Sequence, residues 1–186
     1  MKDISNKALA ELVLLAVVVS LAGTMVTVSK LTPATGGVLG QAKVNVTSVV
    51  AISLPVNSVD FGTLFQGATD NTTDGSPAPL MLQNDGGVDV NVSASGTVLF
   101  SGTGGGDNTA SFQYKARASG EANSFNTTSS VMSFTNVATT PLSGFIKQLK
   151  YNDATDSAYI DLLINIPMDE PVGEKNSTLT FTAIQA

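Results

Sequence analysis

The sequence predicts an all-β protein, an antiparallel β-sandwich preceded by one hydrophobic helix at the N-terminus. Three observations predict this class. Several short segments beyond residue 40 alternate apolar and polar residues, which is the spacing that buries one face of a strand. Asn, Asp, Gly and Pro cluster between these segments, where turns are expected. No stretch of comparable length beyond residue 30 has the spacing of a helix.

The N-terminal helix is expected within residues 1–30, where basic side chains precede an uninterrupted aliphatic run at 12–19. One interpretation is a secretory signal peptide with a small-residue cleavage site between Ala22 and Gly23. The other is a retained transmembrane helix whose basic start is held on the cytoplasmic side of the membrane. Both interpretations place the rest of the chain in the extracellular space or at the cell surface.

A type IV pilin-like leader is a third interpretation of the same residues. Such a leader is cut just before its apolar helix, and the helix carries a glutamate five residues after the cut. Cleavage after Ala8 would make Glu11 the third residue, so the spacing of this sequence does not fit.

The first strand is expected at residues 44–54, after a linker at 31–40 that holds one Pro and three Gly. The apolar residues expected on its buried face are Val44, Val46, Val50, Ile52 and Leu54. The same alternation predicts strands at 88–92, 112–116, 160–166 and 179–183, and short apolar runs predict strands at 80–82 and 145–151. The chain thus divides into a leader, the linker and a β-sandwich domain at residues 41–186.

Turn-forming residues separate the predicted strands. Residues 84–87 (NDGG) are a hairpin signal between two of them, since Asn, Asp and Gly tolerate positive φ. Residues 152–156, and later Pro167 and residues 171–173, delimit the strands near the end of the sequence. Many short strands with half-buried faces favour a β-sandwich of the jelly-roll or Ig-like type.

The composition excludes several classes of function. The 186 residues include no His and no Cys, which rules out His-assisted nucleophiles, His-ligated metals, disulfides and thiolate zinc sites. The formal charge is -6, whereas nucleic-acid binding needs clustered positive charge. Asp169 and Glu170 lie between two prolines, where a solvated turn is the ordinary interpretation. We therefore expect neither an enzyme nor a nucleic-acid-binding protein.

Five Asn-X-Ser/Thr tripeptides are candidate glycosylation sites in an exported protein. They begin at Asn45, Asn71, Asn91, Asn126 and Asn176. Two of them fall on the outward register of a predicted strand, and three lie in or beside predicted turns. A chain rich in Asn, Ser and Thr also produces such tripeptides by chance, so both interpretations stay open.

Acidic residues in two predicted loops are the candidate metal ligands. They are Asp70 and Asp74 in the first loop, and Asp153 and Asp156 in the second. Calcium prefers oxygen ligands that are presented by loops. The spacing does not match an EF-hand, and Asx-rich turns cap their own backbone without a metal. Calcium is therefore the single candidate cofactor, beside the interpretation that no cofactor is bound.

Three segments carry a resemblance to a known group of proteins. They lie at residues 55–64 (PVNSVDFGTL), 79–92 (including NDGG and VDVNV) and 171–183 (including PVGEK and STLTFTA). Together with the leader, they resemble small exported archaeal surface proteins, similar to archaeal bundling pilins and TasA/camelysin-type biofilm fibre subunits, and more loosely to WxL-type wall domains. The chain has no Trp, so the WxL signature is absent. The resemblance implies a non-enzymatic structural protein and carries no catalytic residue.

The resemblance also implies a route to polymerisation. In such fibres the mature N-terminal segment completes the sheet of the next subunit by strand addition. Cleavage after Ala22 would free residues 24–29 as a donor strand that contains Met25, Val26 and Val28. If the leader is retained, the same residues belong to the helix and cannot be donated.

The sequence therefore predicts an extracellular structural protein, a filament or surface-layer subunit that associates with its own copies. The alternative is a monomeric ectodomain, anchored in the membrane by the N-terminal helix, that serves in adhesion or ligand binding. N-terminal processing distinguishes the two hypotheses, because a donor strand requires cleavage and an anchor requires an intact leader.

Overall fold

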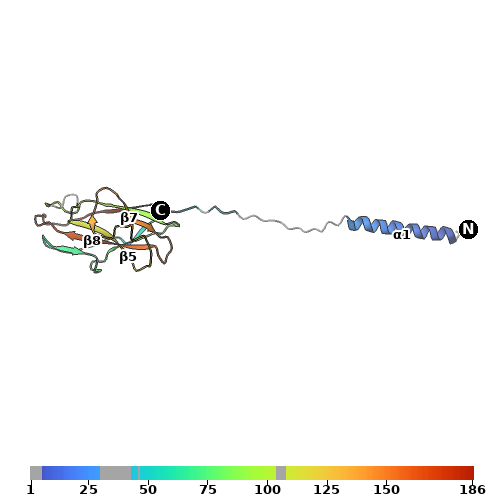
Figure 1. Cartoon of the computed structure of the whole chain (residues 1–186), viewed down its shortest axis with the longest axis horizontal. Coiled ribbons are helices and arrows are strands. Elements are labelled where there is room, and N and C mark those ends of the chain that lie inside the picture. Colours follow the sequence, from blue (N-terminus) through green and yellow to red (C-terminus); the bar gives the residue numbers. More distant parts are fainter. Residues whose placement is uncertain (1–5, 30–42, 46, 104–107) are drawn as a thin grey trace. The chain divides into compact units, whose positions relative to one another are not determined.

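The computed structural model describes residues 6–29, 43–45, 47–103 and 108–186. The chain divides into two compact units, Met1–Asn45 and Val46–Ala186, which are described separately. The helix α1 (Asn6–Ser29) lies in the first unit and every described strand lies in the second, the β unit (Figure 1). The linker expected at residues 31–40 lies outside the described residues.

The helix α1 confirms the expected N-terminal helix but not a membrane-spanning role. It has 24 residues and includes the aliphatic run at residues 12–19. In the part of the chain that the structure describes, no helix is long and apolar enough to cross a membrane. The uninterrupted aliphatic run at residues 12–19 is much shorter than the stretch of about 20 apolar residues that a membrane-spanning helix requires. This finding corrects the expectation of a transmembrane helix within residues 1–30.

The β unit is built from two antiparallel sheets. Among the described residues, the larger sheet holds β1 (Ser53–Val56), β2 (Thr69–Asn71), β3 (Leu80–Gln83), β5 (Phe112–Ala118), β6 (Thr135–Asn136) and β8 (Ser157–Asn165). The smaller sheet holds β4 (Val90–Gly96), β7 (Leu142–Leu149) and β9 (Leu179–Gln185). The order of strands is β1-β3-β8-β5-β6 in the larger sheet, with β2 also paired to β8, and β7-β4-β9 in the smaller sheet.

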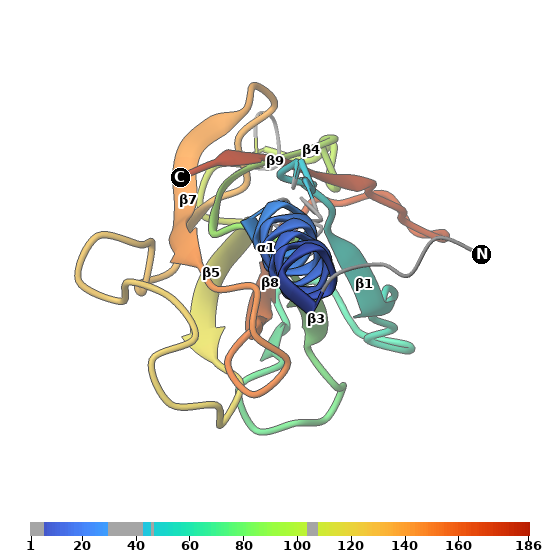
Figure 2. The same cartoon turned by 90° about the vertical axis from the view of Figure 1, so that its right-hand side faces the viewer.

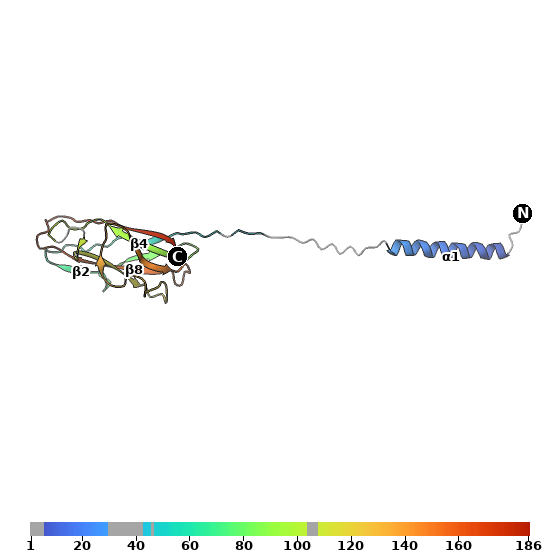
Figure 3. The same ribbon diagram turned by 45° about the horizontal axis from the view of Figure 1, so that its top comes forward.

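The two sheets enclose one hydrophobic core. Figure 2 shows β4, β7 and β9 on one side of the β unit and β1, β3, β5 and β8 on the other, and Figure 3 shows β4 and β8 in separate layers. Tyr114 from β5 contacts Phe145 from β7 with ring centroids 4.5 Å apart, and Phe145 contacts Phe181 from β9 at 6.3 Å. The protein is therefore mostly β, with two antiparallel sheets and one N-terminal helix, which is consistent with the expected β-sandwich.

The alternation of apolar and polar residues predicted the central strands correctly. Along β4 and β5, every second side chain is buried, and each large apolar side chain buried in this way contributes about 1.5–3 kcal/mol to folding. β9 also forms, but its inward-facing side chains stay only half-buried. Around Asp161, β8 is buried on both faces, although the pattern places this residue on a solvated face.

Most of the strand expected at residues 44–54 does not form. Residues 47–52 form no strand, and β1 begins only at Ser53. Val44, expected on the buried face, is 82% exposed. The partner of β1 is the short strand β3, which is followed directly by a turn, so the residues before β1 have no strand to pair with. Val46 lies outside the described residues.

The turn at residues 84–87 does not close a hairpin as expected. It carries the chain from β3 in the larger sheet to β4 in the smaller sheet. The buried amide nitrogen of Asn84 donates to the carbonyl oxygens of Val88 and Leu149, at 2.9 and 3.0 Å. Its amide oxygen accepts a hydrogen bond from the backbone N–H of Gly86 at 3.0 Å. A polar side chain that is satisfied in this way can lie at the edge of the core.

Candidate functional site

A groove along one side of the β unit, with apolar side chains between two largely polar walls, is the candidate functional site. Its volume is about 1050 Å³. One wall is the segment at residues 57–66, which follows β1, and the other is the segment at residues 170–179, which leads into β9. Core side chains line the groove between these walls, among them Leu80, Leu162 and Phe181. The two sheets are therefore open to solvent on the side of β1 and β9.

The strand β9 lies at the edge of the smaller sheet beside this groove. It pairs with β4, and within the described residues no strand pairs with its other edge. Thr97 N donates to Thr178 O at one end of the pair, and Ala186 N donates to Asp89 O at the other. Antiparallel hydrogen bonds alternate along a strand. The N–H groups that point away from β4 are therefore those of Leu179, Phe181 and Ala183.

This edge lacks the features that usually protect an exposed strand. The sequence of β9, LTFTAIQ, has no charged residue and no proline, whereas natural proteins place charges, prolines or bulges at exposed edges. Its pairing with β4 runs over seven residues without a shift in register. Such an edge can accept the backbone of a further strand.

Glu170 links the two walls of the groove. Its carboxylate accepts hydrogen bonds from the backbone N–H groups of Ser101 and Gly102, at 2.8 and 2.6 Å. Lys175 Nζ lies 2.6 Å from Glu170 Oε1. Gln66 Nε2 donates to the backbone oxygen of Glu170, also at 2.6 Å. Because Gln66 belongs to one wall and Lys175 to the other, Glu170 and its neighbours tie the two walls together.

These contacts lower the pKa of two acidic groups. Burial raises the pKa of Glu170, but hydrogen bonds from Lys175, Gly102 and Ser101 outweigh burial, and the net shift is downward. Hydrogen bonds from Thr103 lower the pKa of Asp169, whose carboxylate accepts from the backbone N–H of Thr103 at 2.9 Å. Both carboxylates are therefore charged at neutral pH.

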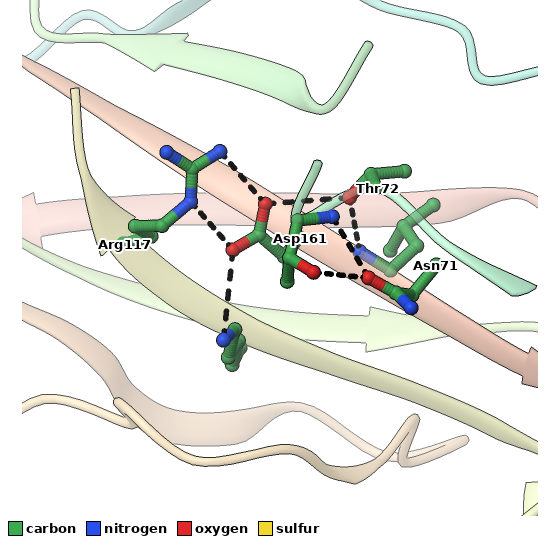
Figure 4. Close-up of polar contacts among 7 residues, drawn as sticks. Asn71, Thr72, Arg117 and Asp161 are labelled. Carbon is green, nitrogen blue, oxygen red and sulfur yellow. Dashed lines mark hydrogen bonds and ion pairs between the residues drawn. The ribbon is translucent and has the colours of Figure 1, made fainter. Parts of the chain in front are cut away.

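A second polar cluster lies on the outer face of the larger sheet (Figure 4). Asp161 is fully buried and accepts two hydrogen bonds from Arg117, at 2.7 and 3.0 Å. Thr72 Oγ1 donates to Asp161 at 3.3 Å and accepts from the backbone N–H of Leu162 at 3.0 Å. The hydrogen bond with Asp161 raises the pKa of Arg117. These groups satisfy one another, so the cluster connects β5, β8 and the residue after β2 and offers no ligand site.

The four candidate calcium ligands stay in separate places. Asp70 lies in β2, and Asp74 lies in the exposed loop that follows. Asp153 is exposed, whereas Asp156 is buried and accepts a hydrogen bond from Gln83 at 3.2 Å. Over the described residues, no three acidic side chains come together as a metal site would require. The structure adds no support to calcium binding, which stays a prediction.

The five glycosylation candidates differ in exposure. Asn45 and Asn176 are exposed, and the other three are half-buried. The amide oxygens of Asn71 and Asn91 accept hydrogen bonds from backbone N–H groups, and the amide nitrogen of Asn126 donates to the side-chain oxygen of Gln148. Glycosylation stays a prediction, for which Asn45 and Asn176 offer the most accessible side chains.

The predicted cleavage site and donor strand lie in the helix. Ala22 and Gly23 are part of α1, as are Met25, Val26 and Val28. Before cleavage these residues are therefore helical and cannot pair with a sheet. The cleavage and donor-strand predictions concern the processed chain and stay predictions.

No model of a known protein family matches this chain, and no curated protein sequence matches it either. The resemblance to archaeal surface-fibre subunits therefore rests on the three sequence segments alone. Two of these segments form much of the walls of the groove, since residues 57–64 and 171–179 line it.

Sequence reasoning missed Glu170, because its partners lie far away in the chain. The prolines on either side indicated a solvated turn, yet its side chain is only 3% exposed. Ser101, which donates to it, is 69 residues distant. The sequence does offer one signal, the basic residue Lys175 five positions later, which is close enough in the chain for an ion pair with Glu170 across a short loop.

Proposed function

We propose that this protein is a non-enzymatic extracellular structural subunit that assembles with its own copies by strand addition, into a filament or a surface layer. The single observation that carries the proposal is the unprotected edge of β9 beside an open groove that contains apolar core side chains. Strand addition supplies backbone hydrogen bonds along such an edge, and alternate side chains fill the adjoining groove.

Two further observations support this function. The leader has the sequence expected of a secretory signal peptide, which would direct export, and the net charge of -6 would keep individual chains soluble before assembly. We also propose that the fold is a Greek-key sandwich, jelly-roll or Ig-like. The crossings of the chain between the two sheets support this type, because such sandwiches connect strands in different sheets.

The proposal predicts that blocking the edge of β9 abolishes assembly. Ala183→Pro removes an N–H group that points away from β4, so the bonds between β4 and β9 stay intact while the edge loses a donor. Ala183→Ser keeps the N–H group and is the matched control. We expect the exported wild type and A183S to form filaments or sheets in negative-stain electron micrographs, and A183P to stay monomeric with unchanged circular dichroism.

Assemblies of A183P equal to those of the wild type would contradict addition at β9. A wild type that stays monomeric at every concentration after export would contradict the proposed function as a whole.

A further inference from the structure

We propose that the groove between residues 57–66 and 170–179 receives residues 43–50 of a second copy of this chain. We call residues 43–50 the pre-strand segment. This inference rests on the proposed function and names the segment that is donated, which differs from the donor predicted at residues 24–29. Four observations carry it: the exposure of the segment, the shape of the groove, their charges and the point where the segment joins its own β unit.

The pre-strand segment has the sequence of a strand, yet its described residues, 43–45 and 47–50, pair with no described strand. Apolar and polar residues alternate over residues 43–47 (KVNVT), and Val50 returns to the same face after Ser48, which is the pattern that places one mostly apolar face against a core. Val44 is 82% exposed, and Val49 and Val50 are also exposed. Burial of such side chains is favourable by about 1.5–3 kcal/mol each, so the segment gains stability once a second surface covers it.

The groove offers what this segment lacks. Its floor contains core side chains, including Leu54, Leu80 and Phe181, and β9 presents outward N–H groups along one side. An extended segment of eight residues is about 26 Å long, and β9 is about 23 Å long at the same rise per residue. The two strands can therefore pair over most of their length while valine side chains enter the groove.

The mouth of the groove adds a further apolar surface. Phe65 at one wall is 84% exposed, and Val172 at the other is 93% exposed. Met168 is also exposed. It precedes the second wall by two residues, and its sulfur lies close to Gly67, the residue that follows the first wall. Large apolar side chains that gather on the surface of a small domain indicate an interaction surface.

The charges of the two partners are complementary. The pre-strand segment carries Lys43 and no acidic residue. The groove walls carry Asp60 and the exposed Glu174, whereas Lys175 is already paired with Glu170. A basic segment therefore meets walls that carry acidic groups, which favours their association.

The attachment of the segment favours a second copy over the same copy. Val49 O accepts a hydrogen bond from Gly87 N, next to the start of β4. Val90 at the start of β4 pairs with Gln185, whereas Gly96 at its end pairs with Leu179, the end of β9 that lines the groove. Val49 is thus held near the end of the β4–β9 pair that lies opposite to Leu179. Head-to-tail contact of this kind generates open chains of subunits.

Disulfide trapping tests this inference, because the natural chain has no cysteine. Val172→Cys marks the mouth of the groove. Val44→Cys and Val50→Cys mark the two ends of the pre-strand segment. One of the two cysteines is therefore expected near the mouth of the groove, whether the donated segment runs parallel or antiparallel to β9. Each single variant is mixed with V172C under mild oxidation, and mixed dimers are quantified by intact mass. A disulfide requires Cα atoms within about 7 Å.

The matched control is Tyr151→Cys, an exposed position in the connection between β7 and β8. We expect several-fold more mixed dimer with V172C than with Y151C, for at least one of the two donors. Equal yields with the two acceptors would overturn the inference. So would a monomeric double variant, V44C/V172C or V50C/V172C, that closes an internal disulfide at high dilution, because its own segment would then fill the groove.

Electron microscopy of the same samples separates this inference from the proposed function. Filaments without the V172C cross-link would overturn the assignment of the donor and leave assembly standing. The cross-link without filaments or sheets would support the donor and contradict the proposed function.

Discussion

Asp161 is a single carboxylate that joins segments far apart in the chain. It is fully buried, yet it is paired with Arg117 and hydrogen-bonded by Thr72. Lys115 lies 3.8 Å away. The side chain of Arg117 is 36% exposed, so the two members of the ion pair differ greatly in their access to water. This asymmetry decides what happens when either one is removed.

We predict that Arg117→Gln destabilises the fold more than Asp161→Asn. The first change leaves a buried carboxylate with only the more distant Lys115 as a cation, which costs about 3 kcal/mol. The second leaves a cation that can turn toward water, and the neutral amide keeps a hydrogen bond to Thr72, so the cost is about 1–2 kcal/mol. Urea unfolding of both variants measures the difference, and a larger loss for D161N would contradict it.

The role of Asp161 could not be predicted from the sequence. The alternation in residues 160–166 places it on the polar face of its strand, and that placement is correct. The pattern does not show that Arg117 and Thr72 cover this face, because they come from distant parts of the chain. Periodicity thus specifies the direction of a side chain, and the topology of the whole sheet specifies whether water reaches it.

At the scale of elements, three loops depend on Glu170. The segments that contain Gln66, Ser101 and Lys175 all bond to this one residue. The pKa of its carboxyl group lies below the ordinary value of 4.5. A group whose pKa is lowered by folding stabilises the folded state above its ordinary pKa, and this stabilisation is lost as the pH falls through the folded pKa.

We predict that the groove loops lose stability as the pH falls from the ordinary glutamate pKa of 4.5 through the lower pKa of folded Glu170, where its carboxylate becomes protonated. The free energy of unfolding of Glu170→Gln is expected to be lower at neutral pH and to vary less with pH than that of the wild type. Urea titrations of both proteins at several pH values, from neutral to about pH 3, measure the free energy of unfolding as a function of pH. Asp169 is present in both proteins, so its titration contributes to both pH profiles. Glu174→Gln, an exposed acid of the same wall, is the matched control, and a pH profile of E170Q that parallels the wild type would contradict the role of Glu170.

The sequence pattern predicted strands correctly where a strand has partner strands in its sheet, and wrongly where the described chain offers no partner strand. The alternation at residues 88–92 and 112–116 correctly predicted β4 and β5, because both strands have a partner on each side. The same alternation predicted a strand from residue 44 onward that does not form at residues 47–52, because no described strand is placed to pair with it. The turn at residues 84–87 was predicted, but its local chemistry does not show that the two strands it joins belong to different sheets.

At the scale of the whole molecule, almost all strand pairing is between distant segments. Within the described chain, β5 and β6 are the only consecutive strands that pair, while β8 pairs with β2, β3 and β5. Domains dominated by such contacts fold slowly, since the entropy of closing long loops is lost before the contacts form.

We predict that refolding from urea takes milliseconds to seconds or longer. The chain has no Trp and three Tyr, so Tyr151→Phe with Tyr159→Phe leaves the buried Tyr114 as the only emitter. Its fluorescence reports the contact with Phe145 between the two sheets, and far-ultraviolet circular dichroism reports the strands. A microsecond relaxation in both signals would contradict folding limited by distant pairing.

The distance between β4 and β9 in the chain has a consequence for the timing of assembly. A ribosome completes β4 well before it makes β7, and β9 comes later still. Until residues 179–185 have been made and have paired with β4, the edge that receives another strand does not exist. A half-made chain therefore presents no finished docking edge to its neighbours. In the proposed assembly, the order of synthesis would in this way restrict recruitment to subunits whose own folding is complete.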